Sequence, residues 1–164
     1  MVYEAFMKLR DYCDSESYKG WDPYDGLNSR IFQSTPLRYW DIARLVLIQS
    51  LKRSPVNLRT FLLVPKQYNA KALGLFINGY SNILRLAQEG DERFGKEADL
   101  IEIIDKLCTL LIEEISPGYS GACWGYNFDW QARRLFLFPA HTPTVVATAF
   151  CAEALFNASE VTGE

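Results

Sequence analysis

Apolar residues recur every three or four positions along several segments, which is the spacing of helices that bury one face. In 70–89 the repeating positions are Leu73, Phe76, Ile77, Tyr80, Leu84 and Ala87. In 96–115 they are Ile101, Ile104, Leu107, Cys108, Leu111 and Ile115. The pattern predicts further helices at 2–13, 35–52 and 142–158, and a short helical turn between 54 and 64. No convincing strand is predicted, and 135–138 makes at most a short extended run.

Capping residues support these boundaries. Thr35 is a good N-cap and Pro36 suits the first turn of a helix, where its missing N–H costs nothing. Asn69 is likewise expected to cap the helix that follows it. The residues 89–92 then form a tight connection to the next helix.

The segment 142–158 differs from the others because it contains a single charge, Glu153. A helix that is apolar or small almost all round is buried on most of its sides. The helix at 96–115, in contrast, keeps charged residues on one face. We therefore expect an all-α fold in which antiparallel helical hairpins form two layers, with 142–158 in the inner one.

Composition excludes several classes of function. The chain has 164 residues and a formal net charge of -3, and its Lys and Arg residues are scattered, which argues against nucleic-acid binding. Arg44 and Arg85 interrupt the best apolar runs, so no membrane span is expected. The first residues lack the continuous apolar segment of a secretion signal, and we expect a cytoplasmic protein.

The four cysteines do not suggest a metal site. They form no CxxC pair, and His141 is the single histidine, so the zinc templates fail. Pairing Cys123 with His141 as nucleophile and base would lack any family signature. We expect neither a metal nor a cofactor.

The most unusual stretch is 121–134, GACWGYNFDWQARR. It places Trp124, Tyr126, Phe128 and Trp130 around one carboxylate, Asp129. A surface loop that serves solubility alone would not be so aromatic, so the stretch is either buried or lines a site. A weaker version of it occurs earlier, where an aromatic, glycine-containing loop also precedes a Thr-Pro pair, and the two resemble a faint internal repeat.

Four segments carry a resemblance to a known family: GWDPYDGLNS (20–29), SPVNLR (54–59), the helix–GDE–helix hairpin, and CWGYNFDWQARR with PAHTPTVVATAF (123–150). They resemble the six-hairpin α/α-toroid proteins encoded with bacterial polysaccharide-biosynthesis enzymes, and more distantly toroid glycosidases, polysaccharide lyases and terpenoid cyclases. A closed toroid needs about twice the helices predicted here. The resemblance thus implies one helical domain over 1–164 that forms a partial toroid, the N-terminal portion of such a protein.

The resemblance also implies a site. In such toroids the loops that enter the inner helices gather at one mouth, where aromatic rings stack on sugars and carboxylates act as acid and base. This implies catalytic roles for Asp129 and Asp25, with Asp22 as another candidate partner. The implied saccharide-binding residues are Trp124, Tyr126, Trp130, Arg133, Trp21 and His141.

Other interpretations of the same residues stay open. The tryptophans can fill the gap between helix ends, Asp129 can bond to backbone N–H groups or to Arg133 or Arg134, and His141 can be a turn residue. The whole domain can also be a non-catalytic scaffold or interaction module that self-associates through exposed apolar helix edges. Whether the chain is an enzyme is left undecided by its residues.

Overall fold

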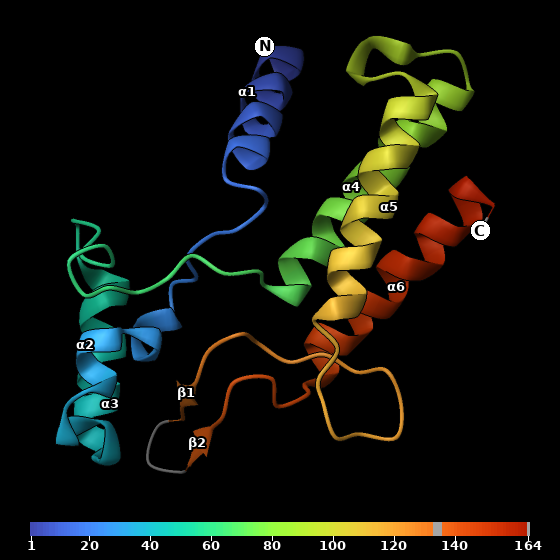
Figure 1. The fold of residues 1–164 in the computed structure, drawn as a ribbon. Coiled ribbons are helices and arrows are strands. Elements are labelled where there is room, and N and C mark those ends of the chain that lie inside the picture. Colours follow the sequence, from blue (N-terminus) through green and yellow to red (C-terminus); the bar gives the residue numbers. More distant parts are fainter. Residues whose placement is uncertain (133–135, 164) are drawn as a thin grey trace.

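The fold consists mainly of helices, as the hydrophobic pattern predicts. The computed structural model describes residues 1–132 and 136–163 (Figure 1). The α-helices are α1 (Val2–Ser15), α2 (Arg30–Gln33), α3 (Asp41–Arg53), α4 (Ala70–Gln88), α5 (Glu97–Glu113) and α6 (Val145–Thr162). The 3₁₀ helices are η1 (Asp25–Asn28), η2 (Pro36–Tyr39) and η3 (Glu92–Phe94). The strands β1 (Trp130–Gln131) and β2 (Leu137–Phe138) pair antiparallel, with Trp130 opposite Phe138.

The main core lies where α4 packs against both α5 and α6 (Figure 1). Its fully buried side chains include Leu73, Ile77, Leu84, Ile104, Leu107, Leu111 and Cys151. A Cβ on Gly74 would lie 3.1 Å from the backbone oxygen of Phe150, so a residue without a side chain lets α4 and α6 approach closely. Small residues on α6, Ala147 and Ala154, line the same contact.

A smaller core lies at α3. Leu27 of η1, Phe32 of α2 and Ile48 of α3 are buried there, which places the short helices before α3 against one face of that helix. Two stretches join this unit to the main bundle: Gly20 and Gln67 form an antiparallel bridge, so the segments that follow α1 and precede α4 run side by side. Figure 1 shows the α2–α3 unit and the α4–α6 bundle on opposite sides of this connection.

The helices at 70–89 and 96–115 are confirmed within a few residues. Asn69 caps α4 as expected, because its side chain accepts a hydrogen bond from the backbone N–H of Ala72. The helix predicted at 35–52 is instead two elements. Trp40 is extended (φ -103°, ψ 117°), so η2 ends there and α3 begins at Asp41. The Thr35 hydroxyl donates to the Phe32 oxygen and makes no cap.

The burial predicted for the last helix is wrong. α6 buries one face, formed by Ala147, Cys151, Ala154 and Ala158, and leaves the opposite flank in solvent, where Phe156 is 64% exposed and Val145 is 87% exposed. α6 packs on α4 and, less extensively, on α5. Its near absence of charge therefore does not come from burial on every side. The helix also begins later than expected, because Thr144 supplies the N-cap in place of Thr142.

None of the helices in residues 1–132 and 136–163 combines the length and the hydropathy needed to cross a bilayer.

Candidate functional site

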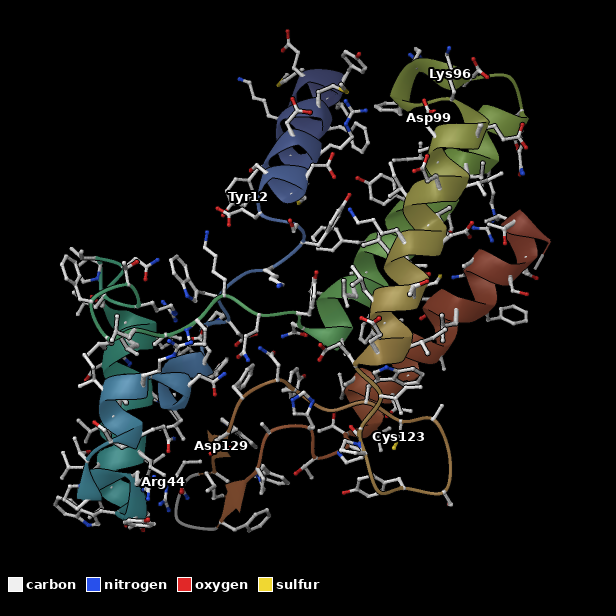
Figure 2. All side chains as sticks on the ribbon, viewed as in Figure 1. Tyr12, Arg44, Lys96, Asp99, Cys123 and Asp129 are labelled. Carbon is white, nitrogen blue, oxygen red and sulfur yellow. The ribbon has the colours of Figure 1, made fainter. Side chains whose placement is uncertain are left out.

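The aromatic segment 124–131 connects the α4–α6 bundle with the α2–α3 unit. At one end, Trp124 and Tyr126 are fixed by backbone hydrogen bonds: the N–H of Thr144 donates to the Trp124 oxygen (3.0 Å) and that of His141 to the Tyr126 oxygen (2.7 Å). At the other end, the Arg44 Nε of α3 donates to Gln131 Oε1 (2.7 Å). Figure 2 shows Cys123 below α5 and Asp129 close to the strands, on the side of Arg44.

Between this segment and the start of α4 lies a cleft of about 520 Å³. Its lining residues are Asp22, Pro23, Tyr24, Asn69, Lys71, Ala72, Leu75, Tyr126, Phe128 and Trp130. This volume falls in the range of small-molecule sites, which combine apolar and aromatic walls with a few polar groups. We refer to this space as the aromatic cleft.

One wall of the aromatic cleft is made of rings at alternate positions of the chain. Tyr126 and Phe128 stack with centroids 5.4 Å apart, and Trp130 stacks on Phe138 at 5.3 Å. Trp130 is 41% exposed, so much of its indole remains accessible. The cleft therefore offers apolar faces to a ligand.

The polar groups of the aromatic cleft come from elsewhere in the sequence. The Asp22 carboxylate accepts hydrogen bonds from the Tyr24 N–H (2.9 Å) and from Asn69 Nδ2 (3.3 Å). Lys71, in the first turn of α4, brings an ammonium group whose Nζ lies 4.7 Å from the ring centre of Phe150. The Tyr24 hydroxyl is engaged by Lys52.

Burial raises the pKa of Asp22, while the hydrogen bond from Tyr24 and the charges of Arg59 and Lys71 act in the opposite direction. A half-buried carboxyl with a shifted pKa in a ligand-sized cleft is a candidate functional group. Asp22 is thus the acidic group of the aromatic cleft.

Asp25 and Asp129, the carboxylates with implied catalytic roles, do not line this cleft, whereas Asp22, the other candidate, does. Asp25 is buried and forms an ion pair with Arg59, whose Nε lies 2.8 Å from Asp25 Oδ1, and its Oδ2 accepts from the Asp22 N–H at 3.0 Å. Burial raises the pKa of Asp25, and Arg59 opposes that shift. Asp129 accepts a hydrogen bond from the Ala140 N–H (2.8 Å), which closes the loop around the strands.

The predicted saccharide-binding residues lie in different places. Tyr126 and Trp130 line the aromatic cleft. Trp21 lines a neighbouring cavity, where its Nε1 donates to the Val64 oxygen (2.9 Å) and Lys66 lies over its ring. Trp124 is only 2% exposed and belongs to the main core.

The last two predicted positions do not add to the cleft. His141 adopts a left-handed backbone (φ 60°) at the turn before α6 and is not a lining residue. Arg133 lies outside the described residues. The structure therefore brings together two of the six predicted binding residues, Tyr126 and Trp130, and adds Asp22, Asn69 and Lys71 to them.

Sequence reasoning missed Asn69 and Lys71 as site residues. Asn69 was expected to cap a helix, which it does, and its Nδ2 is the atom that reaches Asp22. The Asp22 carboxylate was one of two candidates in the same loop, and no local pattern distinguishes it from Asp25. Within residues 1–132 and 136–163, no group of three or more His, Cys, Asp or Glu side chains is placed to hold a metal ion.

Comparison with known protein families, curated proteins and solved structures gives no match to this chain. The site is therefore interpreted from its own geometry.

Proposed function

We propose that the aromatic cleft binds a saccharide. The observation that supports this most strongly is the combination, in one cavity, of the Tyr126, Phe128 and Trp130 rings with the polar groups of Asp22, Asn69 and Lys71. A sugar ring has an apolar C–H face that packs on an aromatic ring, and a rim of hydroxyl groups that need both acceptors and donors. The cleft supplies both kinds of partner.

We propose binding without bond cleavage. Glycoside hydrolysis normally uses two carboxyl groups on opposite sides of the scissile bond. Asp22 is the single carboxylate among the described residues that line the aromatic cleft. Asp25 is held by Arg59, and Asp129 by the Ala140 N–H. In this proposal the two are structural residues, and the partial toroid associated with polysaccharide biosynthesis stays a prediction from the sequence resemblance.

The test is calorimetric titration of the chain with glucose, galactose and N-acetylglucosamine and with their disaccharides maltose, lactose and chitobiose. Trp130→Ala should weaken binding about tenfold, because it removes an exposed ring from the cleft wall. Trp40→Ala is the matched control, since Trp40 is also an exposed tryptophan but does not line the cleft. Absence of binding to every sugar, or an equal loss in both variants, would contradict the proposal.

A second candidate function is self-association as an interaction module. It is favoured by the exposed flank of α6, where Val145, Val146 and Phe156 leave apolar surface in solvent. Sedimentation of the chain and of Phe156→Glu over a range of concentrations tests it. A native chain that remains monomeric throughout would exclude this candidate.

A further inference from the structure

A groove of about 270 Å³ lies between α1 and α4 (Figure 1). Each helix contributes side chains that recur at helical spacing and so share one face. On α1 these include Phe6, Leu9 and Cys13, and on α4 they include Leu75, Gly79 and Ile83. We call this space the apolar groove.

The helix α1 is held at both of its ends. Near its start, Phe6 meets Phe94 of η3 edge to face, with ring centroids 5.3 Å apart. Cys13, near its end, is buried in the main core. Just beyond the helix, the Tyr18 and Tyr80 hydroxyls share a hydrogen bond of 3.0 Å. The apolar groove therefore runs beside a helix that is fixed to the bundle.

Gly79 keeps the apolar groove open in the middle of α4. A glycine in a helix interior destabilises the helix relative to alanine. At Gly74 the close approach of Phe150 accounts for the glycine, but a Cβ on Gly79 would meet nothing within 4 Å. Packing within the described chain therefore does not require a glycine at this position. The space that a side chain would fill belongs to the groove.

The chemistry of the lining favours a hydrocarbon. Apart from Arg10 and the Cys13 thiol, the described lining side chains are apolar or aromatic. The hydroxyl of Tyr80 is already bonded to Tyr18. A sugar would thus find few polar partners here, whereas an apolar group would be removed from water.

The volume of the groove limits the shape of the ligand. An apolar cavity of about 150 Å³ binds benzene, so the groove can hold a larger apolar group. A single turn of a helix, about 10–12 Å across and about 5.4 Å long, fills on the order of 500 Å³. A partner helix is therefore too large to lie inside the groove, and a single hydrocarbon chain is the shape that suits it.

Arg10 is the single charged residue among the described residues that line the apolar groove. Its side chain is 29% exposed and lies 3.6 Å from the carboxylate of Asp11, whose side chain is 70% exposed. Ion pairs at such exposure contribute little. Asp14, whose charge reaches Tyr80 as that of Arg10 does, is not a lining residue. Since a guanidinium binds a carboxylate through two parallel N–H···O bonds, an acidic head group complements the groove.

We infer that the apolar groove binds a single-chain aliphatic carboxylate, with its hydrocarbon chain between Leu9 and Gly79 and its carboxylate on the Arg10 guanidinium. This inference does not rest on the proposed saccharide binding. Among the described lining residues, the groove and the aromatic cleft share Leu75 alone.

Calorimetric titration with butanoate, hexanoate and octanoate, at concentrations below micelle formation, tests the inference. Each added methylene should tighten binding about twofold to fourfold, the upper value being that of a fully buried methylene. An affinity for the native chain that does not rise with chain length would overturn the inference.

The head group is tested with 1-octanol, which has the same chain length as octanoate but no charge. Octanoate should bind about twofold to fivefold more tightly than 1-octanol. Arg10→Gln should remove this difference by weakening octanoate alone. Lys8→Gln is the matched control, because Lys8 is an exposed cation of α1 that does not line the groove. Equal octanoate affinity in Arg10→Gln and the native chain would overturn the assignment of the carboxylate to Arg10.

Gly79→Leu should weaken octanoate binding at least tenfold, because its side chain would occupy the groove. Its melting temperature should equal or exceed that of the native chain, since leucine is the better helix former and its Cβ meets no obstacle. Asn82→Leu is the matched control, because Asn82 is exposed on α4 and does not line the groove. Octanoate affinity that is retained in Gly79→Leu would overturn the inference.

Leu9→Glu tests the opposite wall at a position that is 56% exposed, so folding should be preserved. Its carboxylate would repel that of the ligand and should weaken octanoate at least fivefold. An unchanged affinity in this variant would also contradict the inference.

The remaining outcomes separate this inference from saccharide binding. Trp130→Ala should leave octanoate affinity unchanged, and a loss there would place the hydrocarbon chain in the aromatic cleft instead. A native chain that binds none of the aliphatic carboxylates excludes the apolar groove as their site. Neither result alters the sugar titrations, by which the saccharide proposal is judged separately.

Discussion

The indole Nε1 of Trp124 donates a hydrogen bond to the backbone oxygen of Leu111 at a distance of 2.8 Å. Leu111 lies in the last turn of α5, where carbonyl groups lack partners within the helix. Trp124 therefore completes the end of α5 and fixes the start of the aromatic segment to it. The first tryptophan of the segment stabilises the fold, and the second, Trp130, faces the cleft.

Trp124→Phe should lower the free energy of unfolding by about 1–3 kcal/mol, because it leaves the Leu111 oxygen buried without a donor. Urea denaturation measures the effect. Trp130→Phe is the control, since it keeps a ring at a part-exposed position and removes no side-chain hydrogen bond among residues 1–132 and 136–163. Equal stability of the two variants would show that the bond to Leu111 contributes nothing.

Gly125→Ala should destabilise the chain by about 1–3 kcal/mol or more. A Cβ at Gly125 would lie 2.2 Å from the backbone oxygen of Thr142, and backbone cannot move aside as a flexible side chain can. Gly121→Ala is the control because its Cβ would meet nothing within 4 Å. Thermal unfolding of both variants checks the prediction, and similar melting temperatures would contradict the close approach of the two segments.

Asp25→Asn should cost about 3–5 kcal/mol, because it leaves the guanidinium of Arg59 buried without its counter-ion. The side chains of Asp25 and Arg59 are 3% and 12% exposed. Asp91→Asn removes a similar contact, to Arg93, at the surface and should change stability little. Denaturant unfolding separates the two. A small effect at Asp25 would show that water reaches the pair.

The raised pKa of Asp22 predicts a pH dependence of stability. Burial makes the folded chain hold this proton more tightly than the unfolded chain, whose carboxyl titrates near 3.8. The contribution of Asp22 to the free energy of unfolding therefore falls as the pH rises from about 3.8 through the raised pKa. In Asp22→Asn this part of the pH dependence should disappear.

Measuring the free energy of unfolding of the native chain and of Asp22→Asn at a series of pH values gives the difference directly. The native chain should lose stability relative to the variant as the pH rises through that range. A difference that stays constant with pH would show that burial does not perturb Asp22.

The helices α4 and α5 could be predicted from sequence because each has a continuous apolar stripe, and Asn69 marks the start of α4. The break at Trp40 could not be predicted, because the apolar spacing continues across this residue although its backbone is extended. The burial of α6 was overestimated for a related reason. A helix with few charges can be buried on every side, but the neighbouring elements determine how many of its sides are covered.

The candidate site was predicted in part. The density of rings in 121–134 pointed to Tyr126 and Trp130, which do line the cleft. The same pattern could not separate them from Trp124, since the difference depends on contact with Leu111. The hydrogen bond between Asn69 and Asp22 joins residues 47 positions apart in the sequence. The bridge between Gly20 and Gln67 brings their two segments together. No local motif encodes it.

The two walls of the aromatic cleft differ in how closely they are tied to the core. Asn69 caps α4, Lys71 and Leu75 come from its first turns, and the remainder of that helix forms the centre of the core. Opposite them, Phe128 precedes β1 and Trp130 begins it, in the two-stranded sheet outside the helical core. Trp130 is 41% exposed whereas Phe128 is buried, so Trp130 is the ring position at which a substitution can alter which molecule is selected while folding is preserved.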